Sequence, residues 1–358
     1  MVRILHAADL HLDSPFSGLT PEQAAQRRKH QRRLPALIVD LANQRHCDLL
    51  LLAGDVFDGA RVCPETVEAL VRAFVRFEGQ VFVAPGNHDY YHDRSPWAMT
   101  VWPENVHIFT GKAEAVELPE CRVWGGGFAS AECYDGLPAV VPDGNLQIGV
   151  FHGDPEQSGP YRYFSAEELA DSGLDYLALG HIHIGSGVQY AGNVPWAYPG
   201  CPEGRGFDEL GPKGVLCGEV DHGKADLAFV PLCQRQYHIH ELTLTAEDTV
   251  ETVAAQVLAH AAPKDLVRFV LKGESGPDGV DTTALAERCA GFFYSLSFRD
   301  KTRVSRDLWS RAGEENLTGL FLRCMQARLD GADEEQTALL QKATRFGLAA
   351  LENREEIV

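Results

Sequence analysis

The sequence lacks the features of membrane and secreted proteins. In a chain of 358 residues, no apolar run approaches the roughly 20 residues that a transmembrane helix needs. The first residues, MVRILHAADLH, lead directly into an expected strand, without the basic region, apolar core and cleavage site of a signal peptide. The nine cysteines are scattered, odd in number and form no CxxC pair, which argues against a disulfide framework. We therefore expect a cytoplasmic protein that spans no membrane.

The chain also lacks an excess of basic residues. Its formal net charge is −19 and its sequence pI is near 5.1. Nucleic-acid binders are usually basic, because neutralisation of phosphates drives their affinity. The charge therefore weighs against strong independent binding to DNA or RNA, but it is compatible with a polyanion held by metals and a local patch. A helix expected to begin near Pro21 carries either such a patch or a solvated face, formed by Arg27, Arg28, Lys29, Arg32 and Arg33.

The order of expected elements predicts an α/β fold with three parts. Apolar residues make up 45% of the chain and charged residues 23%, an ordinary globular balance. Over residues 1–235, strand-like runs such as LLLLAG alternate with helical stretches such as LPALIVDLANQR and CPETVEALVRAFVRFEG. Residues 236–304 follow the pattern β-α-β-α-β of a small second domain. Residues 305–358 form a helical C-terminal segment with apolar faces.

Five apolar runs end in clusters of His, Asp or Asn. They read HAADLH, LLLLAGDVFD, VFVAPGNHD, IGVFHGD and YLALGHIH. Binding sites of open α/β sheets form at the carboxyl ends of parallel strands, so these clusters are expected to meet at one edge. Any one of the histidines alone would more often be structural, but five clusters in one chain favour a site for two metal ions. The candidate ligands are Asp9, His11, Asp55, Asn87, His152, His181 and His183.

This ligand set indicates a hydrolase. Imidazoles, carboxylates and one amide, without a thiolate, suit Mn, Fe or Zn. Asp55 is a candidate to bridge two ions, and such ions about 3.5–4 Å apart stabilise the attacking and leaving oxygens in phosphate ester hydrolysis. His88, beside Asn87, is the candidate catalytic proton donor. Asp58 and Asp89 are candidates to orient neighbouring histidines.

The motifs D-x-H, GDxxD, GNHD, H-G and G-H-x-H, in this order between residues 9 and 183, resemble those of the calcineurin-like metallophosphoesterase superfamily. The versions DLHLD, GDVFD and GNHD are similar to those of SbcD-like and YhaO-like DNA repair exonucleases. The later segment YPGCPEGRGFDELGPKGV is similar to the one that closes their nuclease domain. The resemblance implies a two-sheet sandwich flanked by helices, with residues 236–304 as a small capping domain and a helical tail after it.

The resemblance also implies roles for the site residues. It assigns one divalent metal to Asp9, His11, Asp55 and His183. It assigns a second to Asp55, Asn87, His152 and His181. His88 is then the catalytic acid. Such nucleases typically use manganese, and they often work with an SMC-like ATPase of the SbcC type that docks through the nuclease's C-terminal helices.

The leading interpretation is a manganese-dependent DNA repair exonuclease or endonuclease that acts with this ATPase. Arg205 and the basic cluster at Arg27–Arg33 are candidate contacts for the DNA phosphates. The alternatives are a small-molecule, nucleotide-type phosphodiesterase on the same core and a non-catalytic scaffold for the ATPase. Protein phosphatases of the superfamily carry GDxVDRG and GNHE, which GDVFDGAR and GNHD do not match, so a protein substrate is not expected. A homodimer is an assembly that the sequence leaves open.

Overall fold

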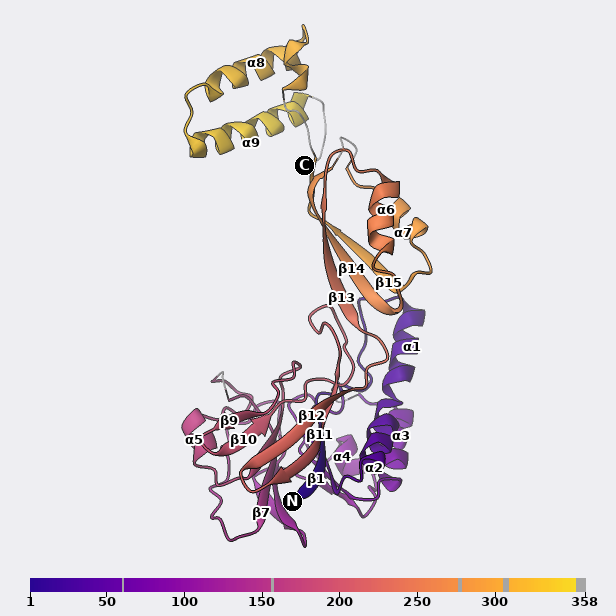
Figure 1. The fold of residues 1–358 in the computed structure, drawn as a ribbon, viewed down its shortest axis with the longest axis vertical. Helices are drawn as coiled ribbons and strands as arrows, with labels where there is room; N and C mark the ends of the chain where they lie inside the picture. Colours follow the sequence, from indigo (N-terminus) through magenta and orange to yellow (C-terminus); the bar gives the residue numbers. More distant parts are fainter. Residues whose placement is uncertain (60, 156–157, 276–278, 305–308, 352–358) are drawn as a thin grey trace. The chain divides into compact units, whose positions relative to one another are not determined.

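The computed structural model describes residues 1–59, 61–155, 158–275, 279–304 and 309–351. The chain divides into two units, Met1–Tyr237 and His238–Val358 (Figure 1). Among the helices of the described residues, none is both long enough and apolar enough to cross a membrane.

The first unit contains two six-stranded sheets. In the first sheet, the order of strands is β12-β11-β1-β2-β3-β4. Its parallel strands are β1 (Val2–Ala7), β2 (Leu49–Leu52), β3 (Gln80–Val83) and β4 (Val106–Ile108). Two antiparallel strands, β11 (Gly214–Asp221) and β12 (Lys224–Pro231), extend it on the other side of β1.

The second sheet has the order β5-β6-β7-β8-β10-β9. Its parallel strands are β6 (Cys121–Gly126), β7 (Leu146–His152), β8 (Tyr176–Gly180) and β10 (Val194–Ala197). The antiparallel edge strands are β5 (Glu114–Glu117) and β9 (Gln189–Ala191). Both sheets thus have a parallel centre, whose carboxyl ends are available for a site.

Alternation along β2 explains how the first sheet is covered on both faces. Leu49 and Leu51 pack in the core between the two sheets, together with residues such as Ile148 of β7. Leu50 and Leu52 pack on the opposite face, in the core formed with α2 (Leu34–Gln44) and α3 (Pro64–Val75). A strand buried on both faces is apolar throughout. The predicted α/β two-sheet sandwich flanked by helices is confirmed.

Shorter helices complete the first unit. α1 (Pro21–Gln31) begins where the sequence predicts it, after a capping box formed by Thr20 and Gln23. α4 (Pro96–Met99) follows the GNHD segment, and α5 (Ala166–Ala170) precedes β8.

The second unit follows the predicted β-α-β-α-β order. Its elements are β13 (Tyr237–Leu244), α6 (Val250–Leu258), β14 (Ala262–Ser275), α7 (Thr282–Arg288) and β15 (Phe293–Asp300). A further short strand, β16 (Arg303–Val304), pairs with β14. A short turn of helix, η1 (Ser310–Gly313), then leads to α8 (Leu317–Leu329) and α9 (Glu334–Leu351), which pack on each other through Leu322 and Leu348. The three-part division at residues 235 and 304 stays a prediction.

Candidate metal centre

The polar clusters follow the carboxyl ends of the central strands in both sheets. In the first sheet, Asp9 and His11 follow β1, Asp55 follows β2, and Asn87 follows β3. In the second sheet, His152 is the last residue of β7, and His181 and His183 follow β8. Because these strands are parallel neighbours within each sheet, the side chains that follow them gather in one region.

Several of these residues lie in left-handed backbone. The φ angles are 53° at Asp9, 42° at His11, 50° at Asp55 and 115° at His181. Residues other than glycine in such regions cost of order 1–3 kcal/mol each, and they concentrate at functional sites. Gly54 has a φ of 88° and lies against the ring of His152, with which a Cβ atom at this position would collide. The glycine of the GD motif is therefore required by both its backbone and its neighbour.

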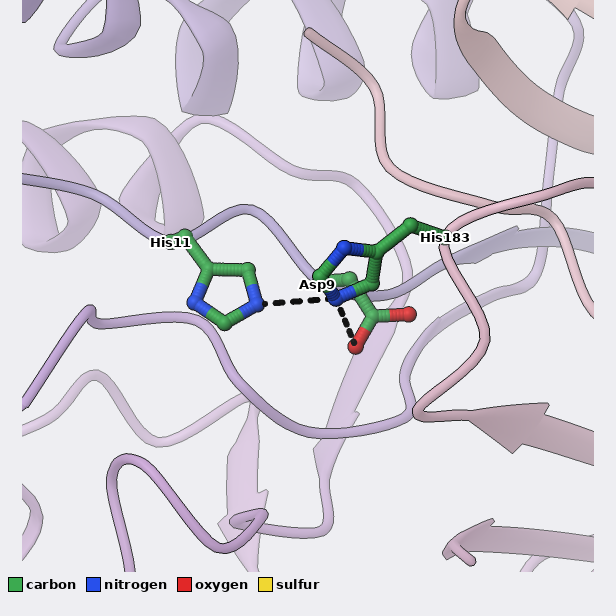
Figure 2. A group of neighbouring side chains, drawn as sticks. All are labelled: Asp9, His11 and His183. Atoms are coloured by element: carbon green, nitrogen blue, oxygen red, sulfur yellow. Dashed lines mark hydrogen bonds and ion pairs between the residues drawn. The ribbon is translucent and has the colours of Figure 1, made fainter. Parts of the chain in front are cut away.

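The first group of candidate ligands is formed by Asp9, His11 and His183. Figure 2 shows the two imidazole rings with their Nε2 atoms facing each other beside the Asp9 carboxylate. The two Nε2 atoms are 3.2 Å apart. Asp9 Oδ1 lies 3.9 Å from His183 Nε2, and Asp55 Oδ2 lies 3.7 Å from His11 Nε2. Asp9, His11 and His183 offer ligand atoms that all lie within 4.8 Å of one another, so a single cation could contact these three side chains.

The hydrogen bonds behind the two rings decide which nitrogens carry protons. His11 Nδ1 donates to Asp58 Oδ1 at 2.9 Å, and His183 Nδ1 donates to Glu209 Oε1 at 2.7 Å. Carboxylates accept, so each Nδ1 holds a hydrogen and each Nε2 presents a lone pair to the other ring. Two lone pairs at this separation repel unless a proton or a cation lies between them. The geometry fits a bound metal ion.

The second group surrounds Asp55 from the other side. His152 Nε2 lies 3.5 Å from Asp55 Oδ2 and 3.0 Å from Asn87 Oδ1. His152 Nδ1 donates to the carbonyl oxygen of Ala53 at 3.0 Å, so its Nε2 again presents a lone pair to acceptor oxygens. The ring of His181 lies beside that of His152, with centroids 5.2 Å apart. Asp55 Oδ2 therefore lies between the two groups.

Burial sets the protonation of these ligands. Burial raises the pKa of Asp9 to about 7 and lowers the pKa of His152 to about 4. Burial opposes ionisation of Asp55 as well, but His152 and His11 hold its pKa below the usual value. Burial lowers the pKa of His183, but the hydrogen bond to Glu209 and the charges of Asp9 and Glu209 together outweigh burial, so the pKa lies above its usual value. The low pKa of His152 favours the neutral imidazole that metal binding needs, whereas Asp9 and His183 would each have to release a proton when a cation binds.

His88 differs from the candidate ligands in its exposure, although its ring lies beside that of His11, with centroids 4.8 Å apart, and it forms a third group of possible metal-binding side chains with His11 and Asp58. Its side chain is 45% exposed, and its Nδ1 lies 3.7 Å from Asp58 Oδ1. Its backbone N–H donates to Asp55 Oδ1 at 2.9 Å, which ties its position to the ligand groups. The exposed imidazole can thus contact a substrate that binds from solvent, while the backbone of His88 stays fixed.

A family model described as calcineurin-like phosphoesterase matches residues 2–185, about half of the chain, and includes every residue of the two groups. The chain belongs to the calcineurin-like phosphoesterase family. It is a metal-dependent phosphoesterase, since members of this family use divalent metals. The donors of both groups fit such ions, because buried imidazoles, carboxylates and an amide converge with their lone pairs on shared space.

Three curated proteins illustrate the relatives of this phosphoesterase. The chain is 35% identical to the uncharacterized metallophosphoesterase YhaO of Bacillus subtilis, over 63% of this chain and 59% of that protein. It is 23% identical to the DNA double-strand break repair protein Mre11 of Methanopyrus kandleri, over 62% and 55% of the two chains. It is 24% identical to the Mre11 of Archaeoglobus fulgidus, over 81% and 72%. The chain thus spans less than two thirds of the first two relatives.

Glu209 is a residue of the phosphoesterase site that the sequence did not reveal. It is 4% exposed and contacts both His183 and Arg205. The candidate substrate contact Arg205 lies at the site, but its guanidinium also contacts Asp58 Oδ1 at 3.2 Å. Hydrogen bonds from His183 and Arg205 overcome the effect of burial and hold the pKa of Glu209 below its usual value. Glu209 thus fixes the orientation of the candidate ligand His183 and of the Arg205 guanidinium.

Two expectations about polar residues near the phosphoesterase site were wrong. Asp89 does not orient a histidine; it accepts hydrogen bonds from the backbone N–H groups of Val56, Phe57 and Gly86, and so joins the loops after β2 and β3. Arg27 is not part of a solvent-facing patch. Its side chain is fully buried and forms an ion pair with Glu203.

The position of Asp55 between the groups gives a test of the metal count. We expect Asp55→Asn to lower the content of both ions, because a charge close to both ligand groups is lost. Metal analysis after loading with Mn²⁺ and desalting measures this. Asp58→Asn is the matched control: Asp58 hydrogen-bonds to His11 of the first group, so its loss should weaken mainly that group. Equal metal content in Asp55→Asn and the unaltered chain would contradict the assignment.

Proposed function

We propose that this phosphoesterase is a manganese-dependent DNA repair exonuclease or endonuclease that acts with an SMC-like ATPase. The observation that carries the proposal is a half-exposed His88 whose backbone is tied to Asp55 and whose ring lies beside that of the buried candidate ligand His11. The similarity to Mre11 proteins, which are named DNA double-strand break repair proteins, supports a DNA substrate. A non-catalytic scaffold for an ATPase would need neither the converging ligands nor an exposed imidazole beside them.

In this proposal Asp55 serves both metal ions. Asp9, His11 and His183 would hold one ion with it, and Asn87, His152 and His181 would hold the other. When bound, the ions polarise the phosphoryl oxygens of a phosphodiester and lower the pKa of a water molecule. Manganese suits the nitrogen and oxygen donors.

The residues of the chain then supply orientation and a proton. His88 donates a proton to the leaving oxygen of the ester, since its ring is the exposed imidazole beside the ligands. Asp58 lies 3.7 Å from His88 Nδ1 and accepts a hydrogen bond from His11. It therefore positions the proton donor and a ligand together. Glu209 positions His183 in the same way.

Replacement of His88 separates proton donation from metal binding. We expect His88→Asn to keep its metal content and to lose about 10²–10⁴-fold in turnover, the usual contribution of a general acid. Turnover of a generic phosphodiester and metal analysis are measured on the same sample. His92→Asn, in the same loop, is the matched control, because His92 accepts a hydrogen bond from the backbone of Arg94. Loss of metal together with activity in His88→Asn would show that His88 is a ligand.

The substrate class has a competitor in the small-molecule phosphodiesterase. Arg27 and Arg205, two expected phosphate contacts, are both held in ion pairs with carboxylates, and the chain carries a net charge of −19. These observations favour a compact substrate. Three other basic residues at the end of α1 and just after it support DNA, because Lys29 and Arg33 are exposed and Arg28 is partly exposed. A comparison of manganese-dependent cleavage of DNA ends with hydrolysis of nucleotide esters decides between the two substrate classes.

Removal of positive charge at and just after α1 tests whether these residues contact DNA. We expect Lys29→Gln with Arg33→Gln to weaken DNA binding and to reduce the slope of log affinity against log salt by about two. Hydrolysis of a small ester at saturating substrate should be unchanged. The double variant Lys112→Gln with Lys224→Gln removes the same charge at exposed positions elsewhere in the unit. If both double variants affect DNA binding equally, α1 makes no specific contact with the substrate.

The C-terminal helices support docking of the proposed ATPase. α8 and α9 pack on each other through Leu322 and Leu348, and they leave other apolar side chains in solvent. Leu317 is 65% exposed and Leu339 is 68% exposed, and Leu320 and Phe346 are also exposed. Exposed apolar side chains on a helix pair fit a groove in a partner.

Acidic substitutions on this hairpin test the docking. We expect Leu320→Glu with Leu339→Glu to abolish association with the SMC-like ATPase in a pull-down, because both charges would be buried at the contact. The melting temperature should be unchanged, since both side chains are exposed. Gln326→Glu with Gln336→Glu adds the same charge at exposed polar positions and should bind normally. Retained association of the leucine variant, or of a chain that ends at Val304, would exclude this surface.

A further inference from the structure

Two thiols from distant segments meet at the edge of the first unit's core. Cys47 follows α2 and precedes β2, whereas Cys217 lies in β11. The two residues are 170 positions apart, yet their Sγ atoms are separated by 3.6 Å. Both are free cysteines. This separation leaves only a small movement to reach bonding distance, about 2.05 Å for a disulfide.

A cavity brings solvent to the two thiols. It has a volume of about 330 Å³ and is lined by Cys47 and Cys217 together with Arg3, Arg45 and Glu219. The cavity lies between the segment that follows the end of α2 at Gln44 and the strands β11 and β12. Cys47 is 6% exposed and Cys217 is 8% exposed. Because both residues line the cavity, a small reagent can reach their sulfur atoms through this opening.

The surroundings distinguish the two sulfurs. Hydrogen bonding with Cys47 lowers the pKa of Cys217 to about 7, and Arg45 acts in the same direction. The same hydrogen bond raises the pKa of Cys47. A thiolate at Cys217 beside a thiol at Cys47 is the arrangement of an attacking and a resolving cysteine.

We propose that Cys47 and Cys217 form an oxidation site that hydrogen peroxide converts to a disulfide. The Cys217 thiolate attacks one peroxide oxygen, the O–O bond breaks, and the hydroxide that leaves takes a proton to become water. The Cys47 sulfur then attacks the sulfur of the Cys217 sulfenic acid, the S–O bond breaks, and the second hydroxide takes the Cys47 proton. Two thiols and one peroxide thus give one disulfide and two waters, with two electrons passing from sulfur to oxygen.

This site is separate from the candidate metal centre along the strands. Cys47 precedes the first residue of β2, whereas Asp55 follows the last one. Cys217 is paired with Leu5, within β1 and before the loop that carries Asp9 and His11. The inference is therefore independent of the proposed nuclease function, and its test requires no measurement of catalysis.

Peptide mapping of the oxidised chain tests the site. The full chain is treated with hydrogen peroxide, quenched with catalase, alkylated under denaturing conditions and digested without reduction. We expect two of the nine thiols to escape alkylation and a cross-linked peptide pair to contain Cys47 and Cys217. Dithiothreitol should restore both. Alkylation of Cys47 and Cys217 under conditions that oxidise the exposed Cys324, or a cross-link of either to another cysteine, would overturn the proposal.

Single variants test the two steps separately. Cys47→Ser should stop at the sulfenic acid, which dimedone traps at Cys217, because the resolving sulfur is absent. Cys324→Ser is the matched control and should still form the cross-link, since Cys324 is exposed on α8. A dimedone adduct at Cys324 with none at Cys217 would contradict the order of attack. Metal content should be the same before and after oxidation, and a loss on cross-linking would show that the two sites are not separate.

Discussion

The candidate metal centre depends on one electrostatic constraint: acceptor atoms of buried side chains face one another across a shared space. When neutral, His11 and His183 direct lone pairs at each other over 3.2 Å, and His152 directs one toward Asn87 and Asp55. Buried acceptors without a donor between them are costly. Divalent cations at these positions would remove the conflict. The fold, the strained loops and the contacts behind the rings all serve to hold this arrangement.

The rings are fixed from behind by partners with different chemistry. Asp58 and Glu209 accept from His11 and His183, whereas a backbone carbonyl accepts from His152. Each partner sets the tautomer of its histidine and leaves Nε2 free for a cation. Asp58 also lies near the exposed His88, so the same carboxylate connects a ligand to the proposed proton donor. This connection explains why the GDVFD motif carries two acidic residues with different tasks.

The sequence predicted what depends on local pattern. Apolar runs such as LLLLAG mark strands covered on both faces, and a ligand follows directly at the end of each run. Parallel pairing then brings these ends together. Glu209 was missed, because it lies in an irregular segment 26 positions after His183 and its role exists only through that contact. We expected Arg27 to belong to a basic cluster in solvent, but it lies on the buried face of α1 with Ala24 and Gln31. An arginine with a buried carboxylate partner, here Glu203, is not visible in a helical pattern alone.

We propose that Asp55 joins two metal sites into one dinuclear centre. Electron paramagnetic resonance of the manganese-loaded chain tests it most directly, because two Mn²⁺ ions that share a bridging carboxylate are magnetically coupled. Saturation of the chain should give the multiline spectrum of a coupled pair, with the two groups around Asp55 filled together. A spectrum of isolated Mn²⁺ ions at full loading would contradict the account.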